Sequence, residues 1–237
     1  MSEFDQYARS YRDVINQHAA ITGETFEYFI DLRLRLLVNA LAGPAPRNVL
    51  DFGCGSGGTE QAMGKLWPQA DIDGIDPSPE SIEAARKLDL PRTWFHVSVG
   101  TELPFADASY DVIYSNGTFH HIEHSDHPAI LREIARVLRP GGHAFIFENN
   151  PYNPLMVREM RHAPIDANAK MLFPHYLARL QRRAGLRVNA TRFYVFYPKQ
   201  LKFLRWSERY LMRVPIGAQY FVWGTKPLAG EVRRHGS

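Results

Sequence analysis

The stretch Val49-Leu-Asp-Phe-Gly-Cys-Gly-Ser-Gly-Gly58 joins a short apolar run to a glycine-rich turn, and a helical pattern follows it. Gly53 and Gly55 can adopt backbone angles that other residues disfavour, and they let the main chain approach a ligand closely. No Lys-Ser/Thr pair follows the glycines, so the turn is not a phosphate-binding P-loop. An acid, Asp76, ends the next apolar run. This combination is typical of a nucleoside-binding strand–turn–helix unit.

Apolar runs and helical patterns alternate outward from this stretch, from about residue 47 to residue 150. We expect strands over residues 49–52, 70–76, 93–99, 110–115 and 142–148, with helices over 59–67, 78–88 and 128–138. Such alternation predicts an α/β fold with a parallel sheet and helices on both of its faces. Because ligands bind beyond the carboxyl ends of the strands, the candidate loops are 51–58, 76–78, 98–107, 115–124 and 148–155.

The pattern changes on both sides of this block. Before it, we expect two helices, over residues 6–20 and 24–41. After residue 150 comes a proline-rich stretch, followed by a helix (176–184), a strand (186–196), a helix (198–213) and a last strand (219–225).

Composition excludes several classes of protein. The 237 residues are 45% hydrophobic and 22% charged, which is ordinary globular usage. No apolar run approaches the length of a membrane span. The N-terminal residues lack the basic and apolar regions of a secretion signal, so we expect a cytoplasmic protein. Cys54 is the single cysteine, which excludes an internal disulfide and a multi-cysteine zinc site, and we expect no metal.

Charge is distributed unevenly along the chain. Residues 1–150 carry 12 Lys and Arg against 21 Asp and Glu, a formal charge of −9, whereas residues 151–237 carry 16 against 4, a charge of +12. A basic C-terminal part can attract phosphates, anionic small molecules or nucleic acid. Solvated faces of amphipathic helices would give the same pattern.

The acids beside the glycine turn indicate the kind of ligand. Asp76, at the end of the second strand, is placed to accept hydrogen bonds from ribose hydroxyls. Asp51, at the mouth of the turn, disfavours a pyrophosphate and suits a cationic group such as an ammonium or a sulfonium. A nucleoside joined to an amino acid through a sulfonium is S-adenosylmethionine. A Rossmann-like domain that binds a dinucleotide, or nothing, is the alternative.

Four ordered motifs across residues 47–148 extend this interpretation. The glycine stretch, Gly74-Ile-Asp-Pro-Ser, Leu103-Pro-Phe-Ala-Asp-Ala-Ser-Tyr-Asp-Val-Ile and Leu138-Arg-Pro-Gly-Gly together resemble the class I S-adenosylmethionine-dependent methyltransferases. The resemblance implies a Rossmann-like, seven-stranded, mostly parallel sheet with helices on both faces and an antiparallel last hairpin. It also implies S-adenosylmethionine as cofactor and S-adenosylhomocysteine as product.

The same resemblance implies the division of the chain. We expect a single methyltransferase domain over residues 1–237. Within it, 1–42 would form an N-terminal helical cap, 43–150 the cofactor-binding core, 151–180 an insertion at the acceptor pocket, and 181–237 the C-terminal part of the sheet.

The resemblance also implies roles for the residues that match the family's motifs. Asp51 would lie near the ammonium, Asp76 would bind the ribose hydroxyls, and Pro77 would pack on adenine. The other cofactor-binding residues implied are Gly53, Cys54 and Gly55 along the methionine and ribose, Gly100 and Thr101 at the adenine edge, Asn116 on the methionine side, and Tyr11 in an N-terminal segment that covers the cofactor.

The acceptor side of the site is indicated by histidines. A hydroxyl acceptor needs a base to remove its proton, and histidine is the commonest choice. His120 and His121 follow the fourth strand, and Glu148 ends the fifth. We predict His120 as the base, assisted by Glu148. The alternative is that these histidines only pack against, or cap, the next helix.

Three functions are therefore considered. The first is O-methylation of a small biosynthetic intermediate, a natural product or saccharide, with an acceptor that carries an anionic group. The second is RNA modification through the basic C-terminal region, against which no appended RNA-binding module is recognised. The third is a cofactor-binding protein without turnover. The sequence does not predict an oligomeric state.

Overall fold

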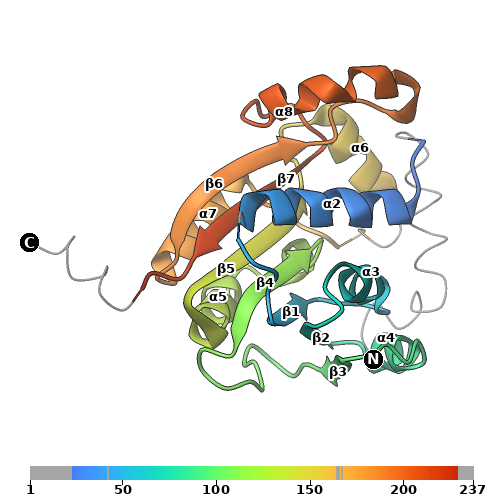
Figure 1. The fold of residues 1–237 in the computed structure, drawn as a ribbon. Coiled ribbons are helices and arrows are strands. Elements are labelled where there is room, and N and C mark those ends of the chain that lie inside the picture. Colours follow the sequence, from blue (N-terminus) through green and yellow to red (C-terminus); the bar gives the residue numbers. More distant parts are fainter. Residues whose placement is uncertain (1–22, 42, 164–165, 167, 229–237) are drawn as a thin grey trace, which may run out of the picture.

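Seven strands form one sheet in the order β3-β2-β1-β4-β5-β7-β6 (Figure 1). The structure, a computed structural model, describes residues 23–41, 43–163, 166 and 168–228. The strands are β1 (Asn48–Phe52), β2 (Asp71–Asp76), β3 (Thr93–Val97), β4 (Tyr110–Asn116), β5 (Leu138–Asn149), β6 (Arg187–Tyr194) and β7 (Gln219–Thr225).

The direction of the strands confirms the expected fold class. β1 pairs in parallel with β2 and β4, β2 with β3, and β4 with β5. β7 lies between β5 and β6 and runs antiparallel to both. The carboxyl ends of the five parallel strands therefore meet at one edge of the sheet, where their loops can share a ligand.

Helices cover both faces of the sheet (Figure 1). They are α2 (Phe26–Leu41), α3 (Gly58–Leu66), α4 (Pro79–Arg86), α5 (His127–Val137), α6 (Pro154–His162), α7 (Pro174–Arg183) and α8 (Glu208–Leu211), with the 3-10 helices η3 (Phe119–His121) and η5 (Lys199–Ser207). Neighbouring strand residues point to opposite faces. Val49 packs in a core with Leu37 of α2 and Met63 of α3, whereas Leu50 packs with Leu131 of α5 and Leu177 of α7.

Some elements differ from the sequence-based expectation. α6 was not expected inside the proline-rich stretch. It begins because the side chain of Asn153 accepts a hydrogen bond from Met156 N at 3.0 Å and because Pro154 occupies a first-turn position where no N–H is needed. The expected helix over 198–213 is instead η5 followed by the short α8, with non-helical angles at Leu201. β5 begins at Leu138, four residues before the strand expected over 142–148.

Other expectations are only partly covered by the structure. The helix expected over 24–41 is α2, and the one over 6–20 lies outside the described residues. The division of the chain into cap, core, insertion and C-terminal part stays a prediction. No helix within the described ranges is long and apolar enough to cross a membrane.

Candidate active site

A cavity of about 680 Å³ opens at the carboxyl edge of the parallel strands. Loops after β1, β2, β3, β4 and β5 line it together with residues of α2 and α6. The structure brings ten of the predicted site residues to this one cavity: Gly53, Gly55, Asp76, Pro77, Gly100, Thr101, Asn116, His120, His121 and Glu148.

The turn after β1 requires glycine at its first position. Gly53 has φ of 85°, and a Cβ added there would lie 2.1 Å from the Oγ1 atom of Thr118. The backbone N–H groups of Gly53 and Cys54 both donate to the Ile75 carbonyl, at 2.8 and 3.1 Å. The turn is thus tied to the end of β2, and its backbone is left uncovered toward the cavity.

Asp76 is held rigidly at the cavity wall. Its Oδ2 accepts a hydrogen bond from Gly55 N at 3.0 Å, and its Oδ1 accepts one from Ser78 N at 2.9 Å. Ser78 in turn caps α4 by accepting a hydrogen bond from Ser81 N at 3.1 Å. Because a carboxylate oxygen can accept two hydrogen bonds, this geometry allows Asp76 to receive the hydroxyls of a sugar.

Two predicted cofactor-binding residues do not line the cavity. Cys54 is buried among Ile82, Ala85 and Phe95, and burial raises the pKa of its thiol well above the usual value. Such a thiol is neutral, so it is not a nucleophile at neutral pH. Asp51 is buried behind the glycine turn. Tyr11, also predicted, lies outside the described residues.

Asp51 forms a buried pair of acids with Glu60, a residue that sequence reasoning missed. Burial, and then the charge of Asp76, raise the pKa of Asp51 to about 8. Burial and the charge of Asp51 raise the pKa of Glu60 well above its usual range. Burial thus favours the protonated forms of this pair, which reduces the negative potential behind the glycine turn.

Arg33 supplies a buried cation at the wall of the cavity. Its Nε donates to Tyr194 Oη at 3.2 Å and its Nη2 to Gln219 Oε1 at 3.4 Å. Arg33 lies on α2 between apolar residues and lines the cavity. The only sequence signal was a charged residue inside an apolar helical stripe. A fixed guanidinium at this position can bind a carboxylate.

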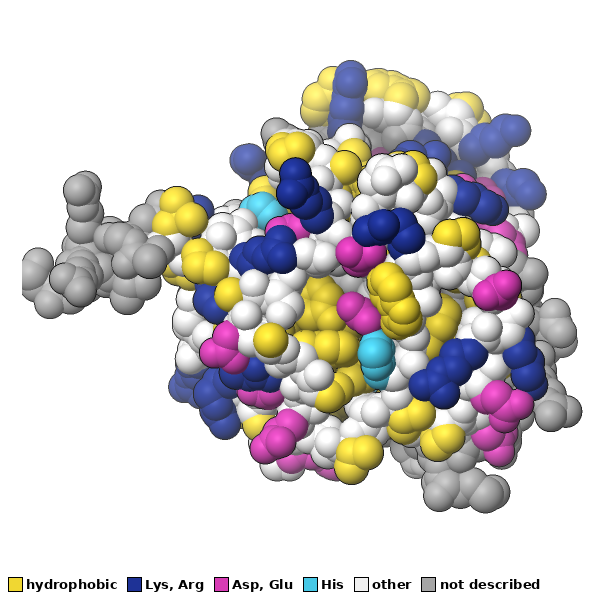
Figure 2. Space-filling view, turned by 60° about the horizontal axis from the view of Figure 1, so that its bottom comes forward, with side chains coloured by type: hydrophobic (Ala, Val, Ile, Leu, Met, Phe, Trp, Pro, Cys, Tyr) yellow, Lys and Arg dark blue, Asp and Glu magenta, His cyan; other side chains and the backbone are white. Residues whose placement is uncertain are grey.

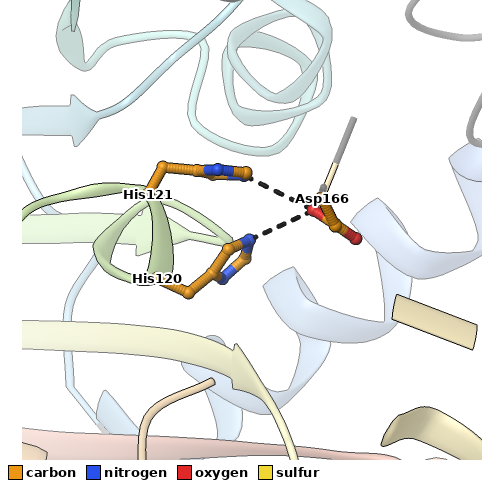
Figure 3. Close-up of side chains that lie close together, drawn as sticks. All are labelled: His120, His121 and Asp166. Carbon is orange, nitrogen blue, oxygen red and sulfur yellow. Dashed lines mark ion pairs between the residues drawn. The ribbon is translucent and has the colours of Figure 1, made fainter. Parts of the chain in front are cut away.

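His120 is held between two carboxylates. Its Nδ1 lies 2.5 Å from Glu148 Oε2, and the other oxygen of Glu148 accepts a hydrogen bond from Phe119 N at 3.0 Å. The Nε2 atoms of His120 and His121 each lie 3.5 Å from Oδ1 of Asp166, so three side chains converge (Figure 3). Asp166 was missed, because it lies in a stretch without a periodic pattern.

These contacts fix the charge of the cluster. Burial disfavours the charged imidazole, but Glu148 and then Asp166 outweigh that effect and raise the pKa of His120 to about 10. Although burial opposes it, hydrogen bonding to His120 and His121 lowers the pKa of Asp166 to about 2. With no acceptor bound, His120 is therefore an imidazolium at neutral pH. It can donate to an anionic oxygen, or accept a proton once Asp166 is displaced.

Among the residues that the structure describes, these same three side chains form the group that could hold a metal ion. One ligand atom each from His120, His121 and Asp166 lie within 4.8 Å of one another. The Glu148 contact to His120 Nδ1 resembles the carboxylate that orients many metal-bound histidines. The ion pairs already occupy the same atoms, so a protonated His120 and a metal are exclusive alternatives. The absence of a metal stays a prediction.

Comparison with known proteins identifies relatives. A family model described as a methyltransferase domain matches residues 49–142. The malonyl-[acyl-carrier protein] O-methyltransferase of Xylella fastidiosa (strain M23) is 32% identical over 155 residues, 64% of this chain and 50% of that protein. The trans-aconitate 2-methyltransferase of Pseudomonas aeruginosa (strain UCBPP-PA14) is 25% identical over 232 residues, 93% of this chain and 82% of that protein.

A solved structure shares the fold. The SAM-dependent methyltransferase TM1293 of Thermotoga maritima superposes with a TM-score of 0.65 at 19% identity, over 94% of this chain and 98% of that one. The chain spans about half the length of several curated relatives that it matches. The matched residues 49–142 contain the glycine turn, Asp76 and the two histidines.

Proposed function

Because the chain belongs to the class I S-adenosylmethionine-dependent methyltransferases, we propose that it transfers a methyl group from S-adenosylmethionine to an oxygen atom of a small molecule. S-adenosylhomocysteine is the product. One observation carries the proposal: the buried His120–Glu148 pair opens onto the same cavity as Asp76 and the glycine turn. The proposed nucleoside-binding site and the proposed general base thus share one cavity.

The cofactor would lie across the carboxyl ends of β1, β2 and β4. In this proposal Asp76 holds the ribose, Pro77, Gly100 and Thr101 contact the adenine, and Gly53, Gly55 and Asn116 contact the methionine part. Arg33 is placed to bind the methionine carboxylate. Asp51 does not line the cavity, so in this proposal it acts on the ammonium only at a distance. A bound cation would favour the ionised form of Asp51 and so lower its raised pKa.

Methyl transfer is an in-line displacement at the sulfonium carbon, so positioning supplies much of the rate. When a hydroxyl acceptor approaches His120 Nε2, it would replace Asp166 there. Loss of that carboxylate lowers the pKa of the imidazole, so Nε2 releases its proton to solvent. The neutral Nε2 then takes the hydroxyl proton as the oxygen attacks the methyl carbon. Glu148 keeps Nδ1 protonated and stabilises the imidazolium that forms.

A carboxylate acceptor is the second candidate, and the charge of His120 favours it. A carboxylate has no proton to lose, and an imidazolium would bind and orient it directly. The relatives named above act, by their names, on a malonyl group and on trans-aconitate. Both acceptors carry carboxylates, on a carrier protein in the first case and on a free acid in the second. A natural product or a saccharide stays a prediction.

RNA modification is less well supported. Figure 2 shows lysines and arginines scattered among acidic and hydrophobic side chains over the face in view, rather than gathered in one basic tract. An RNA-modifying enzyme would bind RNA with a steep salt dependence, and we expect none here.

The test is to incubate the protein with methyl-labelled S-adenosylmethionine and two panels of acceptors, hydroxyl compounds and carboxylic acids, and to identify the labelled product by mass spectrometry. We expect label on oxygen in one panel. Label on nitrogen or carbon, or on added RNA alone, would overturn the O-directed proposal. Cofactor binding without turnover of any acceptor would leave the non-enzymatic alternative.

A further inference from the structure

Exposed hydrophobic side chains are concentrated between β6 and β7. Phe203, Trp206 and Tyr210 are 67%, 66% and 65% exposed, values unusual for side chains of this size. Single exposed hydrophobic residues need no explanation, but a group of them marks an interaction site. We call this group the apolar surface: Leu201, Phe203, Trp206, Tyr210, Val214 and Ile216.

The three aromatic residues share one face of the segment. A 3-10 helix repeats every three residues and an α-helix about every four. Phe203 and Trp206 are three apart within η5, and Tyr210 is four further on in α8. The change of helix type therefore keeps their side chains aligned.

The opposite side of the segment is anchored to the body of the protein. Arg205 donates to Glu24 at 2.8 Å, and its guanidinium lies 4.8 Å from the ring centroid of Tyr28. Glu208 accepts hydrogen bonds from the backbone N–H of Phe196 and Tyr197, each at 3.2 Å. Exposure of the aromatic face is thus a consequence of how the segment is fixed.

Positive charges lie along the same segment as the apolar surface. Lys199, Lys202, Arg209 and Arg213 are exposed along the same segment. Glu208 is the one acid between residues 199 and 216, and backbone groups already occupy it. An apolar face bordered by Lys and Arg, with Trp, Tyr and Phe in it, suits the boundary between anionic headgroups and acyl chains.

We propose that η5, α8 and the turn up to Ile216 bind the surface of a membrane that contains anionic lipids. Aromatic residues could also stack on RNA bases, but Leu201, Val214 and Ile216 could not. Their presence favours lipid. The attachment is interfacial, with the aromatic side chains inserted among the headgroups and the cations on phosphate oxygens.

The surface is adjacent to the cavity. Residues 195–198, which line the cavity, lead directly into η5. Asn153, at the start of α6, donates to the Ile216 carbonyl at 2.7 Å. If the protein has the proposed function, this position implies that the methyl acceptor is amphipathic and enters the cavity from the membrane surface. This part of the inference rests on the proposed function. Lipid binding itself does not depend on that function.

Vesicle co-sedimentation of the full chain tests the proposal. The probes are vesicles of phosphatidylcholine alone and with about a third phosphatidylglycerol. We expect binding to the anionic vesicles, weakened by added salt, and a loss of at least about tenfold in the variant Phe203→Ala/Trp206→Ala/Tyr210→Ala. The matched control is Trp94→Ala, which removes a tryptophan that is 51% exposed on β3, and it should bind as the parent does.

Three outcomes would overturn the proposal: no binding of the parent to anionic vesicles, equal binding by the triple variant, or binding of a single-stranded RNA that competes through the same three residues. Thermal unfolding and cofactor affinity of the triple variant show whether it is folded. Absence of methyl transfer with vesicle binding intact would contradict the proposed function and leave the membrane surface unaffected.

Discussion

Nδ1 of His120 lies 2.5 Å from Oε2 of Glu148, although 27 residues of chain separate the two side chains. His120 follows β4, Glu148 lies near the end of the adjacent parallel strand β5, and both side chains are buried. Removing either partner leaves the other in a low-dielectric environment without its main electrostatic partner, which is costly. The pair is therefore the most informative place to perturb the proposed chemistry.

His120→Ala should reduce turnover of a hydroxyl acceptor by about 100- to 10,000-fold, because the proton acceptor is lost. The dissociation constant for S-adenosylmethionine, measured by calorimetry, should stay within about threefold, since the imidazole is proposed to face the acceptor. His124→Ala is the control, because His124 is an exposed histidine in the same loop. Full turnover by His120→Ala would remove the base assignment.

The pH dependence of kcat/KM should distinguish the two acceptor classes. A hydroxyl acceptor requires neutral His120, whose pKa is raised to about 10 in the acceptor-free protein. The rate should then rise with pH up to about 10. Asp166→Asn removes one of the two carboxylates that raise this pKa, so the midpoint should move to lower pH. A carboxylate acceptor needs the imidazolium, and its rate should instead fall above about pH 10.

Asp76→Asn should weaken S-adenosylmethionine binding by about 10- to 100-fold, since hydrogen bonds to a charged acceptor contribute about 1.5–3 kcal/mol. Calorimetric titration measures the change. Asp71→Asn, at the other end of β2, removes only an exposed ion pair with Arg92 and should bind the cofactor normally. Equal losses in both variants would mean that the sheet, and not the ribose contact, is affected.

Gly53→Ala should destabilise the protein by more than about 2 kcal/mol, because the new Cβ would overlap Thr118 and because φ is positive there. Gly64→Ala provides the comparison: it lies in α3 with no neighbour within 4 Å of the new Cβ, and should be neutral or slightly stabilising. Urea unfolding of both variants gives the two free energies. Similar values would contradict the close approach of the turn to Thr118.

Chelation should leave turnover unchanged. The nitrogens of His120 are already engaged by Glu148 and Asp166, and the cluster is proposed to hold a proton. Activity is compared after dialysis against EDTA and after addition of Mg²⁺, Mn²⁺ or Zn²⁺. Loss on chelation that a single metal restores would show that the three-residue cluster binds that ion instead.

The sequence predicted the site where it depends on local pattern. The glycine turn and the acids at strand ends follow from strand–helix alternation, and adjacent strands bring His120 and Glu148 together. Asp166, Arg33 and Glu60 were not predictable in the same way. Asp166 meets His120 through a stretch without periodicity, whereas Arg33 and Glu60 lie on helices where a charged residue is ordinarily solvated. Their burial is a tertiary effect.

The position of β7 has a consequence for how the protein matures. Glu148 pairs across the sheet with Tyr220, and β7 separates β5 from β6. During synthesis, the backbone groups of β5 that pair with β7 therefore stay unpaired until residue 225 has left the ribosome. We expect the nascent chain to depend on protection of that edge, and the acid that orients His120 to reach its native surroundings only as the last strand is inserted.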